Sequence, residues 1–126
     1  NTLGLAWELV KRVDRPNLGL TLDTFHYHVG GSTTAMIERV PADKIFIVHI
    51  NDCEHRSRET LHDSHRLFPG EGNIPLPGIF DALRKIGYDG PVSIELFRPE
   101  YWEWTPEKIA KRSFESVEAV LSAAAK

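Results

Sequence analysis

Residues 45–50 have the sequence Ile-Phe-Ile-Val-His-Ile, an apolar run with a histidine near its end. The four residues before His49 are all β-branched or aromatic, which is typical of a buried strand. Pro41-Ala42-Asp43 supplies a turn ahead of the run, so we expect a strand over residues 44–50. A histidine at the end of a buried strand needs a polar partner, and His49 is therefore the first residue of functional interest.

Two further apolar runs end at a polar side chain. Residues 18–22 precede Asp23, and residues 92–94 precede Glu95. Taken singly, Asp23 is also explained as a helix or loop cap, and His49 as a buried histidine with a hydrogen-bond partner. Glu95 is harder to explain in this way, because an unpaired carboxylate between two apolar residues is costly to bury.

Helical patterns alternate with these strands. We expect helices over residues 2–15, 33–40, 77–86 and 105–124, where Thr105 caps the last helix and Pro106 occupies its first position. Residues 24–31 are expected to form a loop that ends at two glycines, and residues 51–73 a long structureless loop with a functional role. Alternating helices and strands imply parallel strands joined by right-handed crossovers.

Three such units cannot close a barrel, because an eight-stranded (β/α) barrel needs about 250 residues. We therefore expect residues 1–126 to form one unit, the C-terminal half of a (β/α)8 TIM barrel, with the N-terminal half absent from this chain. A start within a helix and without Met fits this expectation. Chemistry in such barrels lies at the carboxyl ends of the strands, where Asp23, His49 and Glu95 would converge. These oxygen and nitrogen donors suit Mn, Mg, Co or Zn.

The amino-acid composition argues against two classes of protein, those that bind nucleic acid and those that span a membrane. The chain is 41% hydrophobic and 26% charged, as expected for a globular unit, and its formal net charge of -3 with alternating signs argues against a nucleic-acid partner. No apolar run is long enough to cross a bilayer, so no membrane partner is expected. Cys53 is the only cysteine, which excludes an intramolecular disulfide, favours a cytoplasmic protein and predicts an inert thiol.

Four segments carry a resemblance to a known family. They are Leu22-Asp23-Thr24-Phe25-His26, Val48-His49-Ile50-Asn51-Asp52, residues 66–72 (Arg-Leu-Phe-Pro-Gly-Glu-Gly) and residues 93–101 (Ser-Ile-Glu-Leu-Phe-Arg-Pro-Glu-Tyr). Together they resemble the sugar phosphate isomerase/epimerase family, the xylose-isomerase-like TIM barrels. The likeness covers essentially the whole chain and is strongest to the branch that isomerises inosose (2-keto-myo-inositol) in inositol breakdown.

The resemblance implies a site and a reaction. The family holds a divalent ion with Glu, Asp, His and Glu from separate strands; Asp23, His49 and Glu95 match the last three, and the first would lie before residue 1. His26 matches a substrate-facing histidine and Arg66 an arginine that reaches the substrate's oxygens. The implied reaction is isomerisation or epimerisation of a keto-sugar or inosose through an enediolate, with Glu95 as one of two acid/base groups.

Alternatives remain open at this point. A metal-dependent lyase, such as a 3-dehydroshikimate dehydratase, uses the same scaffold, and so does a non-catalytic sugar-binding fragment. A phosphodiesterase of the endonuclease IV type is disfavoured by the acidic balance and by the lack of a three-metal histidine cluster. Without the upstream glutamate, we expect the fragment alone to be inactive and to require either the N-terminal barrel half or assembly as a homo-oligomer.

Overall fold

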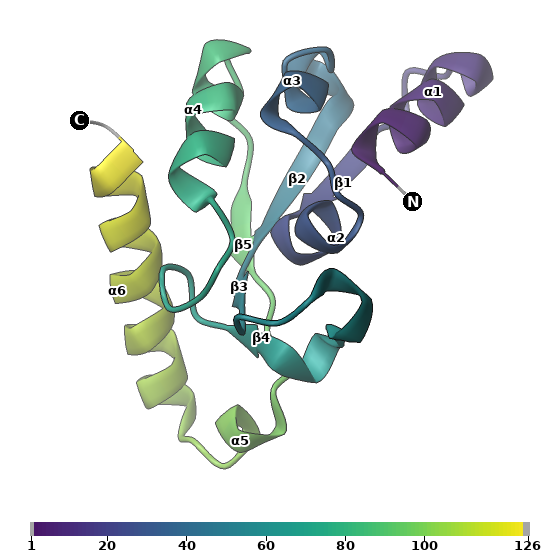
Figure 1. Ribbon diagram of the computed structural model, residues 1–126. Coiled ribbons are helices and arrows are strands. Elements are labelled where there is room, and N and C mark those ends of the chain that lie inside the picture. The colour runs from purple at the N-terminus through teal and green to yellow at the C-terminus, as the bar shows by residue number, and fades with distance from the viewer. Residues whose placement is uncertain (1, 125–126) are drawn as a thin grey trace.

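The computed structural model describes residues 2–124 of the chain, so positions 1, 125 and 126 of the expected unit lie outside the described residues. Its main sheet has three parallel strands in the order β1-β2-β5 (Figure 1). The strands are β1 (Leu20–Asp23), β2 (Ile45–Ile50) and β5 (Val92–Ile94). The helices are α1 (Leu3–Val13), α2 (Thr24–Val29), α3 (Thr34–Ile37), α4 (Leu76–Lys85), α5 (Pro99–Trp102) and α6 (Pro106–Ala124). The expected alternation of parallel strands and helices is confirmed.

The four helices α1, α3, α4 and α6 form a continuous row beside the strands (Figure 1). Helix α4 packs against both α3 and α6, and α3 also packs against α1. Leu22, Val48 and Ile50 of the strands are fully buried in one apolar core with the inner face of α4. Thr21 and Ser93, in contrast, are exposed on the sheet. A helical layer and a partly open sheet are what a segment of a barrel wall presents.

The expected cap at Thr105 is confirmed, and a second threonine, Thr2, caps the first helix. The Thr2 hydroxyl accepts the Leu5 N–H at 3.3 Å at the start of α1, and the Thr105 hydroxyl accepts the Lys108 N–H at 3.3 Å at the start of α6. Helix α1 ends at Asp14, which has a left-handed backbone (φ 47°). Between residues 2 and 124, no helix combines the length and the apolar character that crossing a membrane requires.

The expectation of a loop over residues 24–31 was wrong, because residues 24–29 form α2. The Asp23 carboxylate caps this helix by accepting the His26 N–H at 3.0 Å. The N–H of Gly30 then bonds to the His26 carbonyl at 2.9 Å, and Gly31, with φ at 69°, turns the chain away. A residue that ends a strand thus also starts a helix.

Residues 51–73 were expected to be structureless, which was also wrong. Strand β3 (Asp52–Cys53) pairs antiparallel with β4 (Arg66–Leu67), and two 3-10 turns, η2 (Arg58–Thr60) and η3 (Asp63–His65), lie between them. The Asp52 carboxylate organises the far end of the segment by accepting the N–H groups of Cys53, Gly70 and Ile74 at 2.9, 3.0 and 2.8 Å. These bonds replace the ladder that a longer hairpin would supply.

Candidate metal and substrate site

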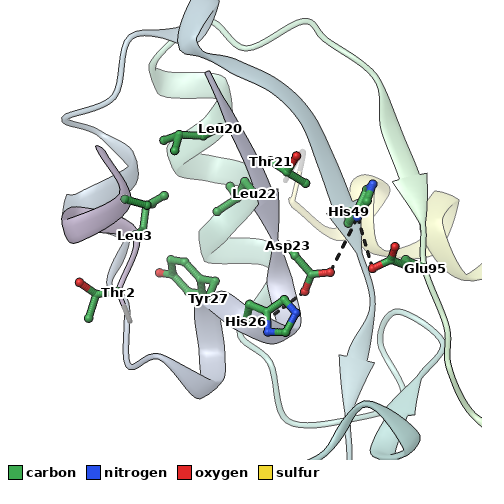
Figure 2. A pocket seen from close by; sticks show the side chains of 11 residues that line it. Thr2, Leu3, Leu20, Thr21, Leu22, Asp23, His26, Tyr27, His49 and Glu95 are labelled. Atoms are coloured by element: carbon green, nitrogen blue, oxygen red, sulfur yellow. Dashed lines mark hydrogen bonds and ion pairs between the residues drawn. The ribbon is translucent and has the colours of Figure 1, made fainter. Parts of the chain in front are cut away.

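Three side chains converge at the carboxyl end of the sheet (Figure 2). Asp23 and His49 are direct register partners in neighbouring parallel strands, and Glu95 follows β5, where its N–H approaches the Ile50 carbonyl at 3.4 Å. His49 Nδ1 lies 3.3 Å from Glu95 Oε2 and 3.9 Å from Asp23 Oδ2. One donor atom from each residue lies within 4.8 Å of the other two. The structure thus brings together the three residues that the sequence analysis singled out, and their role as metal ligands stays a prediction.

The chemistry of this group fits a divalent cation. Two carboxylates and one imidazole are oxygen and nitrogen donors of the kind that Zn, Mn, Mg and Co accept. Burial by itself raises the pKa of Asp23, but the hydrogen bonds from the His26 N–H and from Arg66 outweigh it and leave the pKa below its usual value. Asp23 is therefore an ionised donor at neutral pH, as a metal ligand has to be.

Arg66 contacts the carboxylates of both Asp23 and Glu95. Its Nη1 donates to Asp23 Oδ2 at 2.8 Å and to Glu95 Oε2 at 3.2 Å, and its side chain is only 1% exposed. The guanidinium packs between two aromatic rings, with its central carbon 4.7 Å from the Phe25 centroid and 5.1 Å from the Phe97 centroid. This buried cation balances the paired negative charges of the site.

A cavity of about 310 Å³ opens beside these groups. Asp23, His26, His49 and Glu95 contribute carboxylate and imidazole groups to its lining (Figure 2). The remaining lining residues are Thr2, Leu3, Ala6, Leu20, Thr21, Leu22 and Tyr27. Convergent polar groups against a largely apolar wall are the usual features of a small-molecule site. The predicted substrate-facing residue His26 thus lies at the cavity, whereas Arg66 does not line it and contacts three residues that do, Asp23, Glu95 and His26.

The sequence analysis missed two buried residues that support this site. Asn51 donates its N–H to the Thr24 hydroxyl at 3.0 Å, and that hydroxyl lies 2.8 Å from the Asn51 carbonyl oxygen. The Asn51 side-chain nitrogen also approaches Asp23 Oδ2 at 3.4 Å. These contacts tie the end of β1 to the end of β2. Their signal in the sequence was a polar residue directly after a strand, at position 24 after β1 and position 51 after β2.

The remaining histidines do not join the site. His55 and His62 are exposed. His28 is buried, and both burial and the nearby Arg58 hold its pKa below the usual value. Within residues 2–124, Asp23, His49 and Glu95 are the one group of three such side chains with convergent donor atoms.

Comparison with known proteins agrees with this architecture. The family model for xylose isomerase-like TIM barrels matches residues 1–120. The chain belongs to the xylose isomerase-like TIM barrel family. It is 43% identical over 122 residues to an inosose isomerase of Bacillus velezensis, and the matched region covers 97% of this chain and 44% of the relative. It is 39% identical over 99 residues to a 3-dehydroshikimate dehydratase of Pseudomonas aeruginosa, covering 77% of this chain and 16% of the relative.

A solved structure is similar over nearly all of the chain. The crystal structure of the IOLI protein with a bound zinc atom superposes with a TM-score of 0.94 at 40% sequence identity, covering 98% of this chain and 45% of that one. The resemblance inferred from the sequence motifs is therefore confirmed. The chain spans less than half the length of the inosose isomerase and of the IOLI protein.

Proposed function

We propose that this chain carries the metal-binding part of a divalent-metal-dependent sugar isomerase whose substrate is inosose (2-keto-myo-inositol). The observation that carries the proposal is the convergence of Asp23, His49 and Glu95 at the carboxyl end of the sheet, within 4.8 Å of one another and beside a cavity. The similarity to inosose isomerases over 97% of the chain supports the choice of substrate. A role in inositol breakdown in the cytoplasm is part of the same proposal.

The residues suggest a division of labour. A divalent ion bound at this site would polarise the substrate's carbonyl and stabilise the negative charge that develops on its oxygens. Asp23 and His49 serve as ligands. Glu95 serves as a ligand and as one of two acid/base groups: it takes the proton from the hydroxyl-bearing carbon next to the carbonyl. The hydroxyl proton of that carbon passes to the former carbonyl oxygen, and a proton is returned to the former carbonyl carbon. His26, at the cavity wall, contacts the substrate's hydroxyl groups. Arg66, which does not line the cavity, acts on the substrate indirectly by orienting the Asp23 and Glu95 carboxylates.

The three-stranded sheet also suggests that the site is completed by further strands. β1 and β5 form its two edges, and a closed barrel would pair both. We propose that these strands, together with a second acid/base glutamate, come from an N-terminal barrel half or from another copy of the chain, and that the 126-residue chain alone is inactive. The direct test is turnover of inosose by the native-length protein and by the chain alone, each after metal removal and after addition of Zn²⁺ or Mn²⁺.

Metal binding is testable separately from turnover. His49→Ala removes the central donor of the group, so we expect calorimetry with Zn²⁺ to show no measurable binding. His62→Ala is the matched control, because His62 is an exposed histidine outside the group, and it should retain the affinity of the unmodified protein. Equal losses in the two variants would show that the ion binds elsewhere.

A lyase is the second candidate, because the chain is also 39% identical to a 3-dehydroshikimate dehydratase over 99 residues. The same metal group and carboxylate base would support loss of water next to a carbonyl. Offering inosose and 3-dehydroshikimate separately to the native-length protein distinguishes the two activities, and loss of water from the second substrate alone would replace isomerisation as the proposed function.

A further inference from the structure

The hydrogen bonds of Arg66 divide between two sides of its guanidinium. Nη1 faces the site and donates to Asp23 and Glu95. Nε and Nη2 donate to a single oxygen of Asp63, at 3.0 and 2.7 Å, and Nη2 also lies 3.3 Å from His26 Nε2. Every nitrogen of this buried group therefore has a protein partner, and Asp63 is the one acceptor that the structure shows for Nε.

The local fold explains why Asp63 can reach Arg66. Asp63 opens η3, the 3-10 turn that directly precedes β4, so it stands three residues before Arg66. His65 fixes the turn: its Nδ1 accepts the His62 N–H at 3.0 Å, and its own N–H donates to the His62 carbonyl at 2.8 Å. Pairing of Arg66 with Cys53 then sets the direction of β4. Both ends of the contact are therefore held by the backbone.

Asp63 differs from the other two acidic partners of Arg66. Asp23 and Glu95 are candidate metal ligands, and Glu95 is also the candidate base, whereas Asp63 lies outside that group. The Asp63 side chain is 55% exposed while that of Arg66 is 1% exposed. Removing Asp63 would therefore disturb the core little but would leave a buried Nε–H without its acceptor.

We propose that Asp63 is a positioning residue that holds the Arg66 guanidinium in the orientation facing Asp23 and Glu95. The orientation itself does not depend on the reaction; only its effect on turnover rests on the proposed isomerase function. Asp63 acts through Arg66 and is not itself in contact with the cavity, since it is absent from the cavity lining.

The orientation can be measured by NMR exchange of the Arg66 Nε–H in the native-length protein. Asp63→Ala should speed exchange of this proton about tenfold or more, because its acceptor is lost. Asp63→Asn keeps an acceptor oxygen without the charge and should give an intermediate rate. Glu59→Ala, which removes an exposed carboxylate from η2 in the same segment, is the control and should leave the rate unchanged. Unchanged exchange in Asp63→Ala would overturn the proposal.

The consequence for the reaction is measured by steady-state kinetics on inosose. Asp63→Ala should lower kcat/KM about three- to thirtyfold, with the larger part of the loss in kcat, because a displaced Arg66 misorients the ligand Asp23 and the base Glu95. In an Arg66→Ala background the same change should have no further effect, since the two residues act as one unit. Additive effects would overturn the proposal. If the unmodified protein does not turn over inosose, the proposed function fails, and the exchange experiment alone decides the role of Asp63.

Discussion

Glu95 lies where three kinds of interaction meet. Its Oε2 is 3.2 Å from Arg66 Nη1 and 3.3 Å from His49 Nδ1, and its side chain is 32% exposed at the cavity. A carboxylate in such a place can hold a cation and still reach a substrate. Structure alone shows the contacts, and a substitution separates the two roles.

Glu95→Gln keeps one oxygen donor and nearly the same shape while removing the base. In the native-length protein we expect kcat to fall by about 10²- to 10⁴-fold, with loss of solvent-deuterium exchange into the carbon next to the carbonyl. Zn²⁺ should still bind, though less tightly, because a negative charge is lost beside the ion. Exchange at the normal rate with metal bound would make Glu95 a ligand only.

The burial of Cys53 leads to a prediction about the reactivity of its thiol. It is fully buried, and burial together with the adjacent Asp52 carboxylate raises the pKa of its thiol to about 11. We therefore expect no reaction with a thiol reagent at pH 8 in the folded protein and one equivalent of reaction after unfolding in urea. Rapid labelling of the folded protein would contradict the buried position.

At the scale of elements, the β3–β4 hairpin depends on a close approach at Gly72. A Cβ built there would lie 2.1 Å from the Cys53 carbonyl oxygen and 2.6 Å from Asp52 Oδ1. Neither oxygen can shift without disturbing the local hydrogen bonds, because the Asp52 carboxylate accepts the N–H groups of Cys53, Gly70 and Ile74. The hairpin that carries Arg66 thus depends on a glycine that is outside the cavity.

Gly72→Ala should lower the free energy of unfolding by about 2 kcal/mol or more, since the backbone would have to shift. The matched control is Gly78→Ala in α4, where the nearest atom is Thr34 Cγ2 at 3.9 Å and alanine should stabilise the helix by up to about 1 kcal/mol. Urea unfolding of both variants checks the prediction. A Gly72→Ala midpoint equal to that of the unmodified protein would show that the segment adapts.

Local signals predicted some elements well and others poorly. Thr105 was predicted to start a helix because a hydroxyl cap acts on the N–H groups of its own helix, which is a local signal in the sequence. Helix α2 was missed because Asp23 both ends a strand and caps a helix. The β3–β4 pair was missed because it is two residues long on each side and is held by Asp52 bonds that reach up to 22 positions along the chain.

At the scale of the whole molecule, the sheet edges and the outer helix faces remain open. Several large apolar side chains are at least 39% exposed; on the two end helices they are Leu5, Leu9 and Val13 of α1 and Phe114 and Leu121 of α6. Exposed strand edges and apolar helix faces favour association. We therefore expect the isolated 126-residue chain to be oligomeric, aggregated or poorly folded in sedimentation and melting experiments. A monomer with a cooperative melt would contradict the half-barrel interpretation.

The sequence by itself determined the succession of the three main strands along the chain, the parallel α/β class and the identity of the three converging side chains. It could do so because strand runs, caps and the residues that follow them are local features, and parallel strands carry their carboxyl ends to one edge. Only the tertiary structure decided the environment of Arg66. Its contacts with Phe25 and Phe97 and its bonds to Asp23 and Glu95 join residues up to 43 positions apart. No local pattern encodes such a contact, because it forms only when separate elements pack together.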